Sequence, residues 1–222
     1  MTKYKIVIFD LFGTLVYSFP RQEYETVLAE MSSLLSVPNY EFLRLWSGTS
    51  KQRFTGIFPD IEANLKHICQ ELKVQVTDAL IEEAARIRFN FAVRSMKLKP
   101  GSIEVVSSLK SDGFRLALIS NSAPEAPVIW KDLPFARLFD VAVFSCQVGL
   151  QKPDPRIFRL ALEQLAVKPE QCLYVGDRAD TDLFGAASIG LHPVLIRVPD
   201  ADVANWNGLV INSLEDLLEL VK

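Results

Sequence analysis

Residues that could carry chemistry follow four short apolar runs of this 222-residue chain. Three groups of polar side chains come directly after such a run and Lys152 comes a little beyond one, so the four groups meet only if the chain folds the ends of the runs together. Together they offer carboxylates, a hydroxyl, an amide and an ammonium group. The residues concerned are Asp10, Gly13 and Thr14, then Ser120 and Asn121, then Lys152, and finally Gly176, Asp177 and Asp182.

Three of these residues, Asp10, Asp177 and Asp182, would place three negative charges in one crevice. That arrangement is unfavourable unless protons or a cation neutralise it. Mg²⁺ prefers oxygen ligands and commonly takes one or two carboxylates together with water and substrate phosphate. The chain has only two histidines and no CxxC pair, which argues against zinc. The spacing therefore favours a magnesium site.

The apolar runs themselves read as strands that are buried on both faces of a parallel sheet. Helix-like or loop segments separate them, and this alternation is typical of a doubly wound α/β domain. In such a sheet, ligands bind beyond the carboxyl ends of the strands, where the polar residues stand. The expected strands are Tyr4–Phe9, Phe114–Ile119, Val141–Phe144, Cys172–Val175 and Pro193–Ile196.

The segment between the first two expected strands has a different character. It has helical apolar spacing over Gln22–Ser36, Ile61–Leu72 and Thr77–Ser95, with Thr77 placed as an N-cap. Proline and glycine mark its entry and exit. We therefore expect two domains: a Rossmann-like core of residues 1–17 plus 97–222, and an inserted all-helical domain of residues 18–96.

Composition excludes several classes of protein. The formal charge of −3, from 24 Lys and Arg against 27 Asp and Glu, gives no excess of positive charge to bind nucleic acid. No apolar run is long enough for a signal peptide or a membrane span. Three scattered cysteines suggest no disulfide framework and fit a reducing cytoplasm. The sequence leaves a monomer and a homodimer equally open.

The order of these four motifs, with a helical insert after the first, resembles the haloacid dehalogenase superfamily of hydrolases. The resemblance covers nearly the whole chain, from the motif at Asp10 to the GDxxxxD motif at Gly176 to Asp182. It implies a Rossmann-like core, a helical cap that closes over the crevice and selects the substrate, and a small-molecule substrate such as a phosphate ester.

The resemblance also implies a role for each motif residue. Asp10 would be the nucleophile and would form a covalent aspartyl intermediate that water hydrolyses. Ser120 would hydrogen-bond the transferring group, and Lys152 would neutralise and orient Asp10. Gly13 and Thr14 would shape the turn after the nucleophile, where backbone N–H groups can meet an oxyanion. The residues expected to contact substrate are Gly13, Thr14, Ser120, Asn121 and Lys152.

The same resemblance assigns the magnesium ligands. Asp177 would bind Mg²⁺ together with Asp10 and the backbone carbonyl of Phe12, and Asp182 would hold the waters of the metal. The favoured function is thus a Mg²⁺-dependent phosphatase of small phosphorylated metabolites that acts through an aspartyl-phosphate on Asp10.

Phe12 departs from the phosphatase pattern, in which a second Asp two residues after the nucleophile protonates the leaving alcohol. Loss of a positioned acid or base typically costs roughly 10²–10⁴-fold in rate. A halide needs no proton, and 2-haloacid dehalogenases tend to carry an aromatic residue there and a cap Arg, for which Arg44 and Arg53 are candidates. They work without metal, however, and have Ser where this chain has Asp177.

Phe12 thus favours a dehalogenase, whereas Asp177 favours a phosphatase. The acidic motif carries more weight, because Asp177 and Asp182 together supply two carboxylates for a metal site. Aryl and acyl phosphates have acidic leaving groups that depart without a proton. Two further alternatives stay open. Phosphonoacetaldehyde hydrolase also lacks the second Asp and uses a cap lysine, for which Lys51 or Lys66 could be proposed. The site could also be degenerate and only bind a phosphoryl group.

Overall fold

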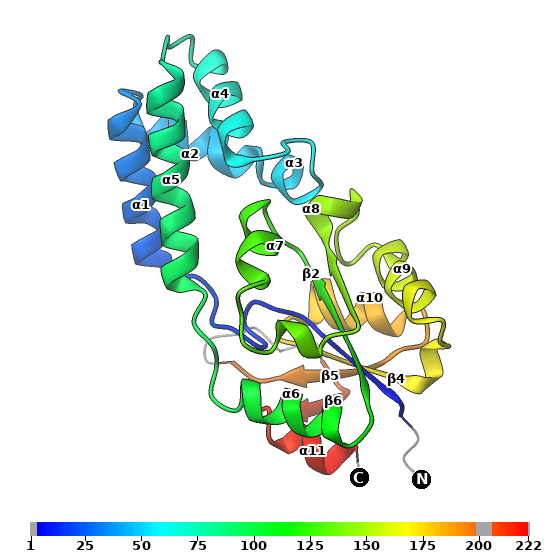
Figure 1. Ribbon diagram of the computed structural model, residues 1–222. Helices are drawn as coiled ribbons and strands as arrows, with labels where there is room; N and C mark the ends of the chain where they lie inside the picture. The colour runs from blue at the N-terminus through cyan, green and yellow to red at the C-terminus, as the bar shows by residue number, and fades with distance from the viewer. Residues whose placement is uncertain (1–3, 199–205, 222) are drawn as a thin grey trace.

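The core of the protein is a six-stranded parallel sheet with strand order β3-β2-β1-β4-β5-β6 (Figure 1). The computed structural model describes residues 4–198 and 206–221, so the parts of the expected core at 1–3, 199–205 and 222 lie outside the described residues. The strands are β1 (Ile6–Phe9), β2 (Arg115–Ser120), β3 (Val141–Phe144), β4 (Cys172–Gly176), β5 (His192–Ile196) and β6 (Leu209–Ile211). This confirms the doubly wound α/β class.

Side chains of the central strands alternate between two separate hydrophobic clusters, one on each face of the sheet. In β1, Val7 and Phe9 belong to one cluster, whereas Ile6 and Ile8 belong to the other. All four residues are buried, which is why the strand reads as a continuous apolar run without polar alternation.

Helices cover both faces of the sheet. On the face of Val7, the helices α6 (Ser102–Ser111), α7 (Glu125–Trp130) and α11 (Asp216–Leu220) contribute to the cluster. On the opposite face lie α9 (Pro155–Leu165) and α10 (Phe184–Ala187), and a π-helical turn (Ala179–Leu183) precedes α10. The remaining short elements are α8 (Ser145–Val148) and the 3-10 turns Ala136–Leu138 and Pro169–Gln171.

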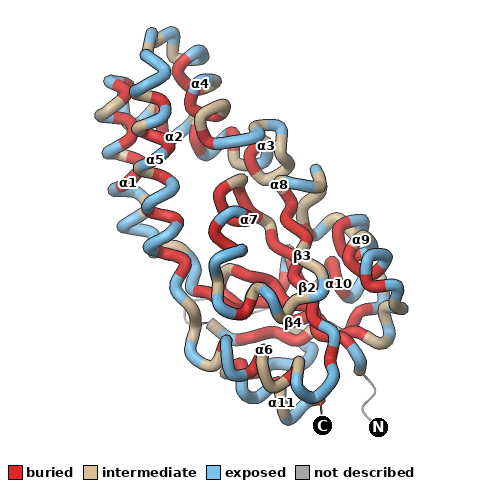
Figure 2. Tube along the Cα trace, in the orientation of Figure 1, coloured by how far each residue is buried: buried red, intermediate tan, exposed pale blue. Residues whose placement is uncertain are grey.

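Most of residues 18–96, between β1 and α6, is helical and packs around a third cluster of its own. Figures 1 and 2 show these helices as a layer set apart from the sheet, with buried residues running along its inner faces. The helices are α1 (Arg21–Leu34), α2 (Asn39–Gly48), α3 (Ser50–Phe54), α4 (Ile61–Glu71) and α5 (Asp78–Ser95). We call this segment, residues 18–96, the helical insert.

The chain enters and leaves the helical insert through two adjacent strands of backbone. The N–H of Tyr17 donates to the carbonyl of Lys97 over 2.9 Å, and the N–H of Lys99 donates to that of Leu15 over 3.0 Å. Residues on either side of the insert are thereby tied together directly after the turn that follows Asp10.

Several details differ from the expected elements. The helices α2 and α3 and the edge strand β6 were not expected; α3 and β6 are too short, at five and three residues, to show a clear period. Strand β1 begins at Ile6 rather than Tyr4, and β2 extends to Ser120. Thr77 does cap α5, because its hydroxyl accepts a hydrogen bond from the N–H of Leu80.

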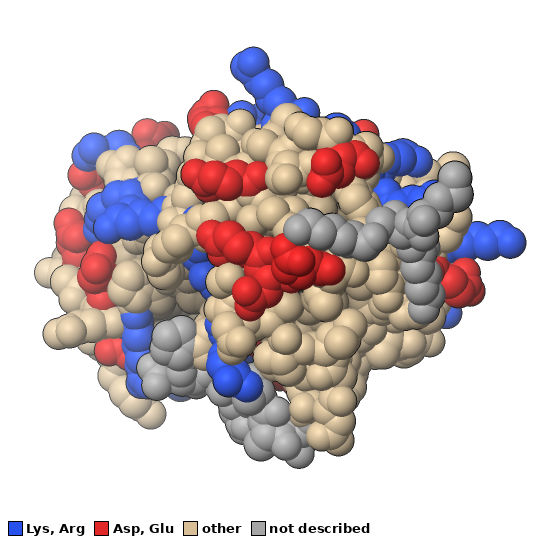
Figure 3. Space-filling view, turned by 90° about the horizontal axis from the view of Figure 1, so that it is seen from below, with Lys and Arg blue, Asp and Glu red and all other residues tan. Residues whose placement is uncertain are grey.

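The surface shows a mixture of charges on the side opposite the helical insert. In Figure 3, acidic side chains gather near the middle of this view and basic side chains lie around them. Within residues 4–198 and 206–221, no helix is both long and apolar enough to cross a membrane. The described cysteines, Cys69, Cys146 and Cys172, are all free.

Candidate active site

The structure brings the four motifs together at the carboxyl ends of the central strands. Strand β1 pairs with β2 on one side and β4 on the other, so Asp10 lies between Ser120, the last residue of β2, and Asp177, which follows β4. The strand order reverses direction between β1 and β4, and this is where a crevice opens in a doubly wound sheet. Asp10 is 6% exposed.

Lys152 forms the electrostatic centre of the site. Its Nζ donates to Oδ1 of Asp10 over 2.6 Å and lies 2.5 Å from Oδ1 of Asp182, with the lysine side chain only 2% exposed. Burial opposes the charge of this ammonium group, but the two carboxylates outweigh burial and raise the pKa of Lys152. The lysine is therefore a cation at every physiological pH.

Tyr174 is a site residue that the sequence reasoning missed. Its hydroxyl accepts a hydrogen bond from Nζ of Lys152 and donates one to Oδ1 of Asp182, each over 3.0 Å. Tyr174 lies within strand β4, where an aromatic residue looks like any other core residue. Its position two residues before the GDxxxxD motif gives no signal that its hydroxyl reaches the lysine.

Asn121 positions the loop of Lys152 through backbone contacts. Its side-chain amide donates to the carbonyl of Lys152 over 2.9 Å, and its Oδ1 accepts from the N–H of Lys152 over 2.8 Å. This reciprocal pair joins the segment after β2 to the segment after β3, so Asn121 orients the lysine in addition to the substrate contact expected of it.

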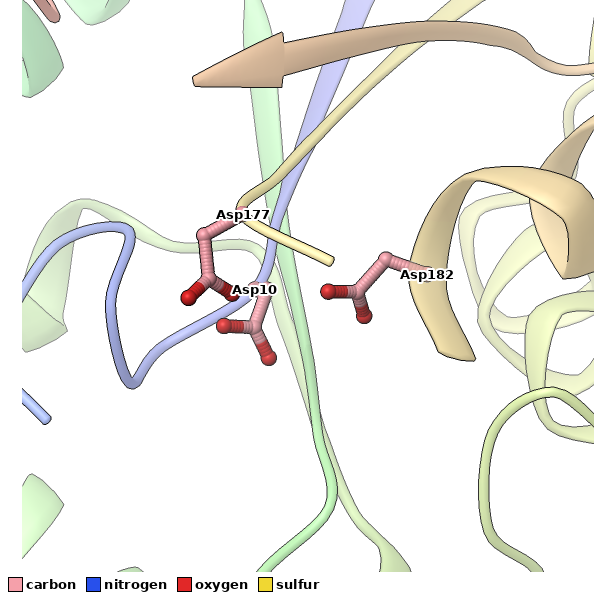
Figure 4. Close-up of side chains that lie close together, drawn as sticks. All are labelled: Asp10, Asp177 and Asp182. Atoms are coloured by element: carbon pink, nitrogen blue, oxygen red, sulfur yellow. The ribbon is translucent and has the colours of Figure 1, made fainter. Parts of the chain in front are cut away.

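The three aspartates converge as the sequence predicted. One carboxylate oxygen from each of Asp10, Asp177 and Asp182 lies within 4.8 Å of the others, and Figure 4 shows the three side chains directed toward a common point. All three residues are buried. Among the described residues this is the one group of acidic, histidine or cysteine side chains able to hold a metal ion.

The electrostatics of this group fit a divalent cation. Burial, with smaller contributions from Asp182 and Asp177, raises the pKa of Asp10 to about 7 although Lys152 opposes the rise. Burial and Asp182 raise the pKa of Asp177 to about 6. Three carboxylates face one ammonium group, so a dication would bring the site to neutrality. The donors are all oxygen atoms, which is the preference of Mg²⁺.

Gly13 lets the turn after Asp10 approach Asp177. Its φ is +80°, and a Cβ at this position would lie 2.0 Å from Oδ2 of Asp177. The N–H of Gly13 donates to Val16 over 2.7 Å and that of Thr14 to Leu11 over 3.3 Å. These two amides are used inside the turn, so the structure does not support their expected contact with substrate.

Other donors of the same turn are available instead. Within the described part of the chain, the N–H groups of Leu11 and Phe12 make no hydrogen bond. The hydroxyls of Thr14 and Ser120 are buried and also lack a hydrogen-bond partner among the described residues. Buried polar groups normally have partners, so these groups indicate a position for a polar ligand beside Asp10.

Lys99 is a second residue that the sequence reasoning missed. Its Nζ donates to the carbonyl of Gly13 over 2.8 Å, and it comes from the segment that leaves the helical insert. Burial lowers its pKa, while the charge of Asp177 acts in the opposite direction. The Lys-Pro-Gly sequence at 99–101 indicated only a boundary.

A family model of haloacid dehalogenase-like hydrolases matches residues 4–190, which is most of the chain. The chain belongs to this hydrolase family. Over 128 residues it is 32% identical to a protein named glyceraldehyde 3-phosphate phosphatase from Methanothermobacter thermautotrophicus. The match covers 54% of this chain and 56% of that relative, so it spans little more than half of each.

Solved structures of haloacid dehalogenase-like hydrolases share the fold over nearly the whole length. A HAD phosphatase from Thermococcus onnurineus has a TM-score of 0.72 at 23% identity and covers 97% of both chains. A 2-haloacid dehalogenase from Pseudomonas syringae pv. Tomato has a TM-score of 0.70 at 24% identity and covers 98% of this chain and 97% of that chain. The fold is therefore common to phosphatases and dehalogenases.

Phe12 lies where the crevice meets the helical insert. Its ring packs edge to face against Phe19, with ring centroids 5.1 Å apart. Phe19 in turn contacts Phe91 of α5 in the same manner, at 5.1 Å. The position two residues after Asp10, which the resemblance gives to an acid, thus holds an apolar ring that packs against the helical insert.

Proposed function

We propose that this protein is a Mg²⁺-dependent phosphoric monoester hydrolase that acts on small phosphorylated metabolites through an aspartyl-phosphate on Asp10. The observation that carries the proposal is the convergence of Asp10, Asp177 and Asp182 around Lys152. The relative named as a phosphatase agrees with it. Free cysteines are consistent with a reducing cytoplasm as its location.

Asp10 is the nucleophile of the proposed reaction. Lys152 holds its Oδ1, which leaves Oδ2 to attack phosphorus while the bond from phosphorus to the ester oxygen breaks. Water then attacks the same phosphorus, the bond between phosphorus and Oδ2 breaks, and inorganic phosphate and free Asp10 result. The N–H groups of Leu11 and Phe12 and the hydroxyl of Ser120, which have no other hydrogen-bond partner in the described chain, would hydrogen-bond the phosphoryl oxygens.

The acidic group fits a magnesium ion for the reasons of charge and donor type given above. Asp10, Asp177 and the carbonyl of Phe12 would hold the ion, and Asp182 would do so through water. When bound, Mg²⁺ would offset the negative charge of the carboxylates and of the phosphate ester. Lys152 and Tyr174 fix Asp182 through direct contacts.

Phe12 limits the leaving groups that this site can release. An alkoxide departs slowly without a general acid, and Phe12 has no proton to give. A phenolate or a carboxylate is stable enough to leave unprotonated. We therefore expect aryl and acyl phosphates to be better substrates than alkyl phosphates.

We further propose that the helical insert, residues 18–96, serves as a cap over the core of residues 1–17 and 97–222. Its entry and exit strands are bonded to each other beside the turn after Asp10. Movement about this pair of strands would open and close the crevice without disturbing the sheet.

Phe12 also favours a second candidate, a 2-haloacid dehalogenase. Against it, Asp177 is buried beside Asp10 and would repel an incoming carboxylate. The lysine option suggested by phosphonoacetaldehyde hydrolase has no support, because Lys51 and Lys66 are exposed and Lys66 pairs with Asp78. Arg44 is likewise exposed and pairs with Glu41.

The test compares Asp10→Asn with Asp180→Asn. Asp180 lies in the same acidic motif but is exposed and pairs only with Arg178. We expect Asp10→Asn to lose Mg²⁺-dependent hydrolysis of phenyl phosphate and Asp180→Asn to keep it. Full activity of Asp10→Asn would exclude the aspartyl-phosphate. Halide release from 2-chloropropionate in EDTA would establish the dehalogenase, and phosphate binding without any turnover would indicate a degenerate site.

A further inference from the structure

A large cavity adjoins the site between the helical insert and the core. Its volume is about 860 Å³, within the range of pockets that hold whole organic ligands. The insert contributes α1, α2 and α3, and the core contributes the segment around α7, which faces them in Figure 1. The cavity is far larger than a three-carbon leaving group requires.

Five aromatic side chains form part of the wall of this cavity. Phe12, Phe19, Tyr24, Trp46 and Phe54 all line it. The indole N–H of Trp46 donates to the hydroxyl of Tyr24 over 2.7 Å. Trp46 is buried, and the guanidinium of Arg53 lies over its ring, 4.0 Å from the centroid. The aromatic surface that a ligand could reach therefore belongs to the partly exposed side chains of the lining, Phe12, Phe19, Tyr24 and Phe54.

The charged side chains in the wall disfavour a cationic ligand. Arg53 is buried, and its Nη1 donates to three uncharged oxygens, on Trp46, Thr49 and Asn64. Arg88 is neutralised by Glu125, at 2.5 Å. The guanidinium of Arg53 therefore leaves a net positive charge in the buried wall, which disfavours a cationic leaving group.

The cavity borders the crevice that holds Asp10. Phe12, two residues after Asp10, and Asn121, which holds the loop of Lys152, belong to its lining. A phosphate ester bound at Asp10 would thus direct its organic part into this cavity. The lining at this junction thus includes the apolar ring of Phe12 together with the amide of Asn121.

Building on the proposed phosphatase activity, we propose that the substrate is a phosphate monoester with a bulky aromatic leaving group, neutral or anionic, that fills this cavity. The aromatic wall would bind the ring, and the phenolate formed would leave without the acid that Phe12 cannot supply. The cavity and the missing acid thus select the same chemical class.

Two aryl esters separate the size of the leaving group from its acidity. Phenol and 2-naphthol are similarly acidic, so phenyl and 2-naphthyl phosphate differ mainly in the apolar surface that they can bury. We expect kcat/KM to be about tenfold higher for 2-naphthyl phosphate, because burial of the second ring adds binding energy. Glyceraldehyde 3-phosphate, the substrate in the name of the relative, should be the poorest of the three.

A variant that fills the cavity tests whether the leaving group binds there. Ser50, the first residue of α3, lines the cavity and is partly buried, whereas Ser33 on α1 is exposed and does not line it. We expect Ser50→Phe to lower the ratio of kcat/KM for 2-naphthyl over phenyl phosphate by about tenfold, and Ser33→Phe to leave the ratio unchanged. Ser47→Phe, also in the lining, serves if Ser50→Phe fails to fold.

Binding of 2-naphthol, measured by calorimetry, keeps this inference separate from the proposed function. If no ester is hydrolysed, the phosphatase proposal fails, yet 2-naphthol that binds the wild type and not Ser50→Phe would still support the aromatic cavity. If esters are hydrolysed through Asp10 but phenyl and 2-naphthyl phosphate react equally, or glyceraldehyde 3-phosphate is preferred, the aromatic cavity is overturned while the phosphatase stands.

Discussion

At the scale of single residues, the site depends on contacts that allow no extra atom. The turn after Asp10 approaches the carboxylate of Asp177 so closely that only a residue without a Cβ fits at position 13. The same turn leaves the N–H groups of Leu11 and Phe12 without hydrogen-bond partners in the described chain. Small changes here should alter chemistry more than folding.

We predict that Gly13→Ala weakens Mg²⁺ binding. The new methyl group would displace Asp177, and its positive φ would cost about 1–2 kcal/mol of stability. Gly113→Ala is the matched control, since Gly113 has a φ of +85° but no heavy atom within 4 Å of the added Cβ. Urea denaturation should show both losses of stability, whereas calorimetry should show about tenfold weaker Mg²⁺ binding only in Gly13→Ala. Equal Mg²⁺ affinities would contradict the role of this contact.

We predict that Phe12→Asp raises turnover of alkyl phosphates about tenfold or more, because it restores a carboxylic acid beside the leaving group. Phe12→Leu, which removes the ring without adding an acid, should give no such gain. The measurement is kcat on glycerol phosphate with Mg²⁺. If Phe12→Asp is no faster than the wild type, another group already protonates the leaving oxygen.

At the scale of elements, the parallel sheet aligns the ends of its strands, and ion pairs fix the helices to it. Asp140, just before β3, accepts hydrogen bonds from Lys110 of α6 over 2.7 Å and from the N–H of Leu116 in β2 over 2.8 Å. It thus joins two strands and a helix at the end of the sheet opposite the site.

We predict a pH-dependent contribution of Asp140 to stability. Burial alone would raise its pKa, but the bonds from Lys110 and Leu116 outweigh burial and lower it. The stabilisation is therefore complete above pH 4, roughly the pKa of an unfolded Asp, and is lost as the pH falls through the lower pKa of the folded state. Asp140→Asn should cost about 1 kcal/mol at pH 7 and less at pH 3.

The exposed Asp112, at the end of α6, provides the comparison. Its replacement by Asn should leave the urea midpoint within experimental error of the wild type at both pH values. A difference between wild type and Asp140→Asn that stays constant from pH 7 to pH 3 would show that ionisation of Asp140 has no part in its effect.

At the scale of the whole molecule, the helical insert and the core meet through a buried ion pair. Arg88 of α5 pairs with Glu125 of α7, and each side chain is 5% exposed. The guanidinium also lies over the rings of Phe19 and Tyr24, at 5.2 and 5.4 Å from their centroids. This ion pair joins α5 of the insert to α7 of the core.

We predict that Glu125→Gln destabilises the protein by about 3–5 kcal/mol, because it leaves a buried guanidinium without its counter-charge. The double variant Arg88→Met with Glu125→Met removes both charges and should recover much of that loss. Thermal unfolding of Arg88→Met, of Glu125→Met and of the double variant gives the coupling energy. Additive losses would mean that the two side chains do not interact.

The sequence by itself determined the fold class and the edge of the sheet at which the motif residues lie. Short runs that are apolar on both parities, as in Ile6–Phe9, indicate strands covered on both faces, and in a parallel sheet the polar residues after such strands share one edge. Asp10, Asp177, Asp182 and Lys152 were found in this way. Short elements such as α3 and β6 escaped because a few residues show no period.

Only the tertiary structure decided which other groups reach these residues. Tyr174 contacts Lys152 and Asp182, and Lys99 contacts Gly13, because separate strands and loops converge in space. The pairing of Arg88 with Glu125 likewise joins segments 37 positions apart, as their numbers show. The spacing of apolar residues within a helix or strand predicts which side of that element is buried. The hydrogen-bond or ionic partner of a buried polar atom depends instead on how different elements pack, and the spacing within one element does not encode that packing.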